Sequence, residues 1–222
     1  MAGPIFRLLW RLLFSDYAIP NEISILYRPN TAWIPHFHFS PPNSSFRLHV
    51  RRSSRVHAGP AEKRQWQAAG AMVSEVGPNG VLGWFTATSG TCVSIFKPVF
   101  PGVELPPTGP LPIEHFAPRS LWWKHELLHR RAMADFENIV QQIRKDFDVL
   151  EAEFLAEAPS VLTGTIAHKS EFVEYCFYRA EQATDDWIKK LSARSDLEFK
   201  DPPYRAMWQK FNRQAGITGM PA

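Results

Sequence analysis

Apolar side chains recur at steps of three and four residues through the C-terminal half, and this pattern constrains the fold more than any other feature. Because such steps place side chains on one face of an α-helix, the pattern predicts a long amphipathic helix. Ser120 is a suitable capping residue, so the helix is expected from residue 121 to about 158, ending before Pro159. Its apolar stripe comprises Phe136, Val140, Ile143, Phe147, Leu150 and Phe154.

The same periodicity predicts a second helix from about residue 168 to 193. Cys176 lies on its apolar stripe, which favours a small buried hydrophobic residue rather than a reactive thiol. Pro202 and Pro203 are expected to break the chain before a short helix over residues 204–214, and Gly216 is a natural helix stop. The stripe of the second helix comprises Val173, Cys176, Ala180, Ala183, Trp187 and Leu191.

The middle of the chain has the short apolar runs and concentrated turns of an antiparallel meander. Strands are predicted over residues 71–76, 81–88 and 92–100, separated by turns at 77–80 and 89–91. Pro98 removes a backbone donor, so the third strand should end there or lie at a sheet edge. Residues 101–119 contain six prolines and are predicted to be a connector. The fold class is therefore α+β, with antiparallel strands followed by long C-terminal helices.

Charge and cysteine content limit the functional classes. The net charge is +3, but residues 1–60 carry seven Lys/Arg and two acids, whereas residues 61–222 carry eighteen and twenty. The larger part of the chain is thus not a polycation, and no nucleic-acid partner is expected. Two cysteines, Cys92 and Cys176, are too few for a disulfide framework or a four-thiolate metal site, which predicts a reducing, cytoplasmic location.

The N-terminal 55 residues are predicted to be an irregular, Pro- and Arg-rich segment. Arg7 and Arg11 interrupt the opening apolar run, which argues against a signal peptide; a surface helix, a presequence or a membrane-surface helix fits the composition better. No transmembrane span is predicted anywhere in the chain. His36 and His38 share one side of an extended segment but lack a third nearby metal ligand.

Residues 125–129 read HELLH and match the H-E-x-x-H pattern of zinc peptidases. In that pattern two histidines one helical turn apart ligate zinc, and the glutamate activates the metal-bound water. Glu151 and Glu153 are the available third ligands, yet on a continuous helix the first lies about 33 Å from His129 along the axis. No Gly or Pro breaks the predicted helix between residues 121 and 158. We therefore interpret the histidines as packed beneath Trp122, Trp123 and Phe136, with a zinc metallopeptidase site of His125, Glu126 and His129 as the alternative.

Several segments, taken in order and spacing, resemble the secernin and dipeptidase-A-like branch of the N-terminal-nucleophile (Ntn) hydrolases. The resemblance extends from about residue 50 to 216, and its most specific pieces are FKPV at 96–99 and LWWKHE at 121–126. The segments that carry it are VHAG at 56–59, AMVS at 71–74, WFTAT at 84–88, CVSIFKPV at 92–99, SLWWKHE at 120–126 and LEAEF at 150–154.

The resemblance implies part of a four-layer αββα fold, in which residues 71–100 contribute strands and the C-terminal helices pack over a sheet. It also implies a cysteine-type dipeptidase or amide hydrolase that needs no cofactor. The nucleophile of such an enzyme is a cysteine at the mature N-terminus, with its own α-amino group as the base. In this resemblance His125 and Glu126 belong to a structural helix, and no zinc is implied.

The chain departs from the family pattern at the nucleophile. It begins Met-Ala-Gly-Pro and has no cysteine before Cys92, which is expected inside the sheet. We therefore expect residues 56–216 to be the C-terminal part of a truncated or degenerate secernin-like hydrolase that is inactive alone, followed by a tail over 217–222. A partner supplying the missing half would restore a peptide or amide substrate site, and an uncovered sheet edge favours homo- or hetero-association.

His57 and Ser74 are the only pocket residues that the matched segments suggest, since both fall near predicted strand ends. A turn role for His57 and a pairing role for Ser74 within the sheet are equally consistent with their positions. A third alternative for the whole chain is a non-enzymatic interaction module that uses its long amphipathic helices and its basic start.

Overall fold

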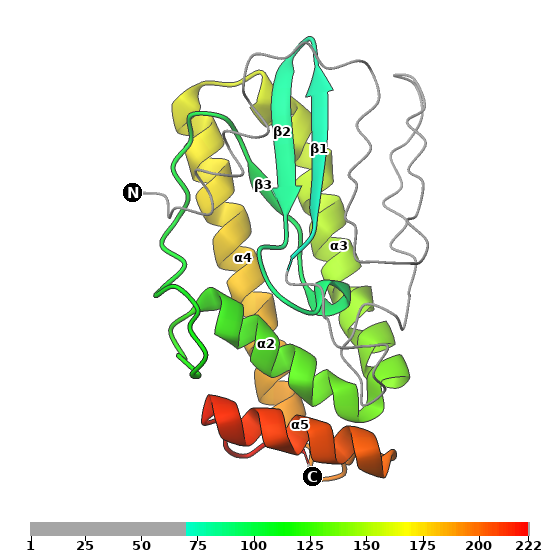
Figure 1. Ribbon diagram of the computed structural model, residues 1–222. Coiled ribbons are helices and arrows are strands. Elements are labelled where there is room, and N and C mark those ends of the chain that lie inside the picture. The colour runs from blue at the N-terminus through cyan, green and yellow to red at the C-terminus, as the bar shows by residue number, and fades with distance from the viewer. Residues whose placement is uncertain (1–69, 222) are drawn as a thin grey trace, which may run out of the picture. The chain divides into compact units, whose positions relative to one another are not determined.

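The computed structural model describes residues 70–221, which lie within one unit of the chain, residues 54–222. The predicted N-terminal segment, the histidines at 36 and 38, and the pocket candidate His57 lie outside the described residues. The described part is mixed α+β, with a three-stranded antiparallel sheet followed by long helices (Figure 1).

The sheet is the predicted antiparallel meander. Its strands are β1 (Met72–Gly77), β2 (Gly80–Phe85) and β3 (Lys97–Val99), in the spatial order β1-β2-β3. Met72 pairs with Phe85 at one end of the hairpin, and Trp84 pairs with Pro98 on the other side. Pro98, which has no backbone N–H, lies on β3 at an edge of this sheet, as predicted, so the central strand keeps all its donors.

The third strand is shorter than predicted, and Cys92 is not in the sheet. A 3₁₀ turn, η3 (Thr91–Val93), replaces the first part of the expected strand. Local bonds replace a strand ladder here: the Val93 N–H donates to the Gly90 carbonyl, and Ser94 Oγ, which lies 2.7 Å from Thr88 Oγ1, donates a 3.2 Å bond to the Ser89 carbonyl. The prediction that residue 92 begins a strand is therefore wrong.

The first predicted helix is two helices. Helix α2 (Leu121–Ala132) ends in a 3₁₀ turn, η4 (Met133–Asp135), from which α3 (Phe136–Leu162) begins. The break needs neither Gly nor Pro, because Met133 and Ala134 are buried in it and Asn138 donates its amide to the Asp135 carboxylate. The expectation of a continuous helix ending before Pro159 is wrong at both points, since α3 continues through that proline.

The remaining helices begin and end at recognisable caps. Helix α4 (Ile166–Ser192) starts at Thr165, whose hydroxyl accepts a bond from the backbone of the first turn. Helix α5 (Pro202–Ala215) starts at Asp201, and its two prolines occupy the first helical turn instead of preceding the helix as predicted. Gly216 ends α5 in the left-handed conformation, with φ of 70°, as predicted.

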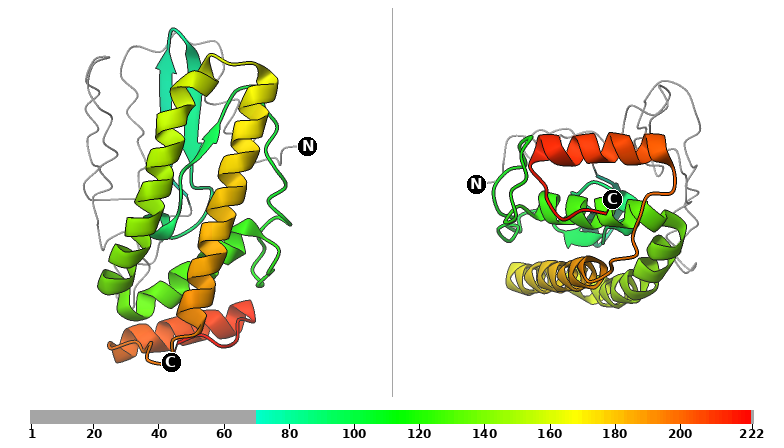
Figure 2. Two further views of the ribbon diagram at one scale, coloured as in Figure 1. Left: turned by 180° about the vertical axis from the view of Figure 1, so that it is seen from behind. Right: turned by 90° about the horizontal axis from the view of Figure 1, so that it is seen from below.

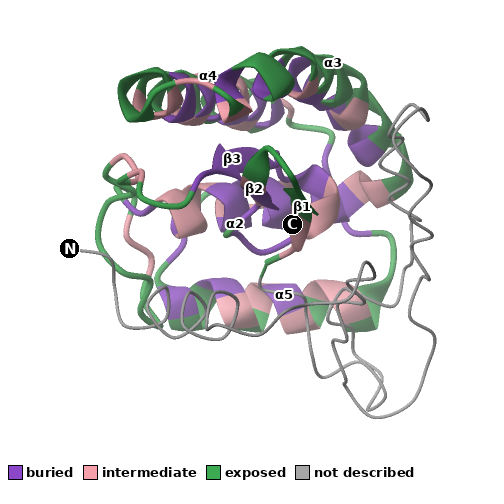
Figure 3. Ribbon diagram, turned by 90° about the horizontal axis from the view of Figure 1, so that it is seen from above, coloured by how far each residue is buried: buried purple, intermediate pink, exposed green. Residues whose placement is uncertain are grey.

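The elements form three rows when viewed along the helix pair (Figure 3). The antiparallel helices α3 and α4 lie on one side, the sheet and α2 occupy the middle, and α5 covers α2 from the other side (Figures 2 and 3). The core between the first two rows contains most of the predicted stripes, including Ile143, Phe147, Phe154, Val173 and Cys176, all fully buried. No helix within residues 70–221 has an apolar stretch long enough to cross a bilayer.

Candidate functional site

The glutamate of the H-E-x-x-H pattern lies at the centre of a buried polar network. Helix α2 turns Glu126 inward, where only 2% of it is exposed. Its Oε2 accepts a bond from Ser89 Oγ, its Oε1 accepts a bond of 2.6 Å from Arg130 Nε, and His129 Nδ1 lies 3.3 Å from Oε2. We call these four residues, together with Asn212, the Glu126 network.

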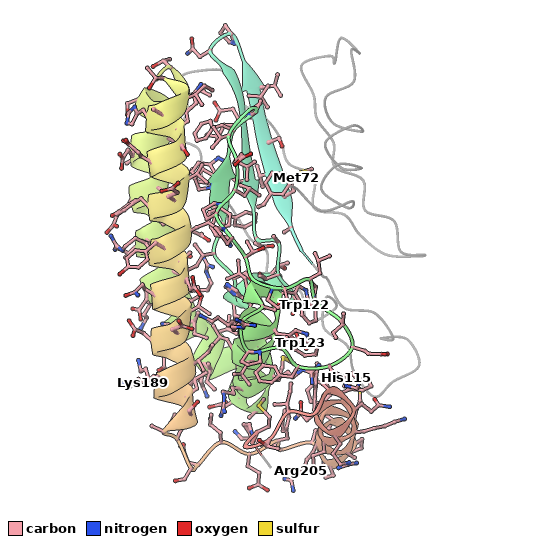
Figure 4. The ribbon with its side chains drawn as sticks, turned by 90° about the vertical axis from the view of Figure 1, so that its left-hand side faces the viewer. Met72, His115, Trp122, Trp123, Lys189 and Arg205 are labelled. Atoms are coloured by element: carbon pink, nitrogen blue, oxygen red, sulfur yellow. The ribbon has the colours of Figure 1, made fainter. Side chains whose placement is uncertain are left out.

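Arg130 connects the network to the C-terminal helix. Its Nη1 donates a 2.9 Å bond to Asn212 Oδ1 on α5, and its guanidinium lies 5.5 Å from the Trp123 ring and 5.4 Å from the Trp208 ring. Both rings are large and buried, so the cation is held between two aromatic faces. The start of α2 and its tryptophans lie next to α5 (Figure 4). The network therefore joins three elements: the loop after β2, α2 and α5.

The charges around Glu126 decide its protonation. Burial opposes ionisation, but His129, Arg130 and Ser89 together outweigh it and lower the pKa of Glu126 from 4.5 to about 2. A carboxylate with so low a pKa and no access to water is a weak base. In this arrangement Glu126 stabilises the interior and is poorly suited to activating a water molecule.

The two histidines of the pattern point to different neighbours. His129 is fully buried, packs edge-on against Trp208 with ring centroids 5.7 Å apart, and lies so close to Gly90 that a Cβ there would be 2.7 Å from its ring. His125 faces α4, with Nε2 at 3.4 Å from Thr184 Oγ1. Burial, then the charges of Lys97 and Lys124, hold the pKa of His125 well below its usual value.

The helix break that a third zinc ligand would require is present, but the two candidate acids have other partners. Glu151 accepts a 2.9 Å bond from the backbone N–H of Phe96 and pairs with Arg144, while Glu153 lies 3.5 Å from Arg179 on the surface. Among residues 70–221, no three His, Cys, Asp or Glu side chains are placed to share a metal ion.

The FKPV segment at residues 96–99 places a lysine in the interior. Lys97 is 1% exposed, and its Nζ donates bonds of 3.0 and 2.8 Å to the carbonyls of Thr86 and Ile95. Burial lowers the pKa of Lys97 from 10.5 to about 8, although the charge of Glu151 opposes the change. Sequence reasoning missed this role, yet a signal existed: this lysine is the one charge in the run CVSIFKPVF.

Neither Cys92, Cys176 nor Ser89 is arranged as an activated nucleophile. Burial raises the pKa of the Cys92 thiol to about 12, and burial raises the pKa of Cys176 also. A thiolate is the reactive species, so both groups stay protonated at neutral pH. Ser89 donates to the Glu126 carboxylate, whereas an activated serine donates to a histidine base.

The two pocket candidates are not brought together by the described residues. Ser74 is half-buried in β1 and pairs with Gly83 of β2, while His57 precedes the described part. The pocket composed of the two residues therefore stays a prediction. Comparison of the chain with protein-family models, curated proteins and solved structures found no match.

Proposed function

We propose that residues 56–216, which the structure describes from residue 70 onward, are the scaffold part of a secernin-like Ntn hydrolase with the four-layer αββα fold. In this proposal they supply strands and helical cover but no nucleophile. Hydrolysis of a peptide or amide bond then needs an N-terminal cysteine with a free α-amino group that these residues do not supply, because Cys92 and Cys176 both lie within them as protonated thiols.

The observation that carries the proposal is that each of the two segments with the most specific resemblance contributes a charged residue to the interior. FKPV at 96–99 places Lys97 in the interior, and LWWKHE at 121–126 places Glu126 there. Each buried charge is compensated by specific bonds, to two backbone carbonyls in one case and to Arg130 in the other. In this proposal the two buried charges fix how β3 and α2 pack, and thus serve the fold rather than the chemistry.

The exposed end of the β1–β2 hairpin supports the proposal that a partner binds the chain. β1 is an edge of the sheet within the described residues, and its second half, together with the turn that follows, is exposed. An unpaired edge offers backbone N–H and C=O groups to a further strand. In the proposed four-layer fold, strands of the missing half would pair at such an edge.

The test is reconstitution of activity. The full chain is assayed for dipeptide hydrolysis alone and after co-expression with an N-terminal half of a secernin-like hydrolase that begins with a processed cysteine. We expect no hydrolysis by the chain alone and hydrolysis by the complex, lost when the partner's first cysteine becomes serine. A stable complex without activity, or no complex at all, would contradict the proposal.

Activity of the chain alone would also contradict it and would identify the alternative. Activity abolished by a chelator and by His129→Ala would establish the zinc metallopeptidase, whereas activity abolished by alkylation and by Cys92→Ser would make that thiol the nucleophile. A matched control for the alkylation arm is Cys176→Ser, because this thiol is fully buried on α4.

A further inference from the structure

The outward side of the α3–α4 pair exposes large apolar side chains. Val149 is 61% exposed, Tyr178 59% and Tyr175 42%, although both helices have well-formed buried stripes on their other side. The exposed side of the two helices faces away from the sheet (Figure 3). We call this surface the outer helix face and define it as Val149, Glu153, Glu174, Tyr175, Tyr178 and Arg179.

Contacts between the two helices hold this face in place. Arg179 of α4 lies 3.5 Å from Glu153 of α3, and its guanidinium is 5.5 Å from the ring of Tyr175. The Tyr175 ring in turn packs edge-on against buried Phe154, with centroids 6.3 Å apart. Tyr178 follows three residues later on the same side of α4. Of this face, Tyr175 and Arg179 are therefore partly ordered before a partner binds, which lowers the side-chain entropy that these two residues lose on binding.

The two helices that form the face carry a net negative charge. Residues 136–192 carry eleven Asp/Glu and six Lys/Arg, a net charge of −5 with histidine neutral. Lys124 pairs with Glu181 and Asp185, so part of this charge is compensated. Glu171 and Glu174 are exposed and make no ion pair with any residue of 70–221. An apolar strip with an acidic border is complementary to a partner that is apolar in its centre and basic at its edges.

We propose that the outer helix face binds a cationic amphipathic helix of another protein. Tyrosines are frequent anchors in such interfaces because they contribute large contact area and a polar end. The acidic border opposes the same face of a second copy, which is equally negative, and an anionic membrane surface, which it would repel. The inference is independent of the hydrolase proposal, because the face lies on the side of the helix pair opposite the sheet.

The probe is an 18-residue peptide of Leu and Lys whose leucines lie on one helical face. Two control peptides accompany it: one with the same composition but scrambled order, and one with Glu in place of Lys. Binding to the full chain is measured by calorimetry at about 50 and 300 mM salt, because Debye screening shortens from about 14 to about 6 Å over this range. Sedimentation of the free chain reports self-association.

Two variants change the face, and two matched variants change similar residues elsewhere. Tyr178→Ser removes an exposed apolar side chain and Glu174→Lys reverses an exposed charge; Val76→Ser and Glu75→Lys do the same at the end of the β1–β2 hairpin. All four positions are exposed, and circular dichroism with thermal unfolding verifies that each variant is folded.

We expect saturable binding of the amphipathic Lys peptide that weakens at high salt. Tyr178→Ser and Glu174→Lys should each weaken it about tenfold, and the hairpin variants by less than about twofold. Three results would overturn the proposal. These are equal affinity of the face and hairpin variants, equal binding of the scrambled peptide, or a dimer of the free chain that Tyr178→Ser dissociates and the peptide does not affect.

Discussion

Replacing Glu126 tests whether its carboxylate is a structural centre. The substitution Glu126→Ala removes the group that compensates Arg130, which is 7% exposed and held between two tryptophan rings. Removing one member of a buried ion pair costs about 3–5 kcal/mol, because the other charge stays buried without compensation. The same contacts lower the pKa of Glu126 from 4.5 to about 2, so they favour its ionised form over its protonated form in the folded protein. At about 1.36 kcal/mol per pKa unit, this preference corresponds to about 3 kcal/mol.

The isosteric substitution Glu126→Gln separates charge from packing. Glutamine keeps the volume and can still accept from Ser89, but it has no charge for Arg130, so a smaller loss of about 2 kcal/mol is expected. The matched control is Glu181→Gln, which alters a half-exposed ion pair with Lys124 and should cost less than about 1 kcal/mol. The assay is urea unfolding of the full chain, monitored by tryptophan fluorescence and far-UV circular dichroism.

The stabilisation by the Glu126 carboxylate should depend on pH in a defined direction. Because folding lowers the pKa of Glu126, its stabilisation is complete above pH 4.5 and is lost as the pH falls toward 2. The difference in unfolding free energy between wild type and Glu126→Gln should therefore shrink as the solution is acidified. A loss below about 1 kcal/mol for Glu126→Ala at pH 7, or a difference that does not depend on pH, would refute the structural role of this carboxylate.

Three further predictions concern the same interior. Gly90→Ala should destabilise the fold by about 2 kcal/mol or more, measured by urea unfolding, because it strains a left-handed backbone position and overlaps the His129 ring. Folding lowers the pKa of Lys97 to about 8, so its contribution to stability should rise between pH 8 and 10.5; wild type and Lys97→Met compared at both pH values would show it, and a flat difference would contradict it. Iodoacetamide at pH 8 should modify Cys92 at least 100-fold more slowly in the native than in the urea-unfolded chain, and equal rates by mass spectrometry would contradict the raised pKa.

Local patterns were sufficient for most of the fold. The three-and-four periodicity located α3 and α4 and most of their buried residues, because a stripe of that period must be covered. Turn residues located the β1–β2 hairpin, and Gly216 located the end of α5. These features depend on neighbours within a few residues, which a single sequence displays.

Features that depend on distant contacts were not predictable. The break between α2 and α3 has no Gly or Pro; it occurs where Met133 and Ala134 are buried. Arg130 also bonds to Asn212, eighty-two residues away, and no spacing rule connects these two residues. The Glu126–Arg130 pair, by contrast, is an i,i+4 pair and was visible in the sequence. The burial of this pair distinguishes a structural network from a surface ion pair, and the burial could be seen only in the three-dimensional structure.

Zinc titration of the tag-free full chain is the most direct measurement of whether the H-E-x-x-H segment is structural. Zinc is added to wild type and to His129→Ala at pH 7.5, with bound metal measured by mass spectrometry after dialysis. Because the histidines and the glutamate have other partners inside the protein, we predict no stoichiometric zinc and no metal-dependent rise in thermal stability for either chain. One zinc per wild-type chain, lost in His129→Ala, would contradict the structural role and favour a metallopeptidase.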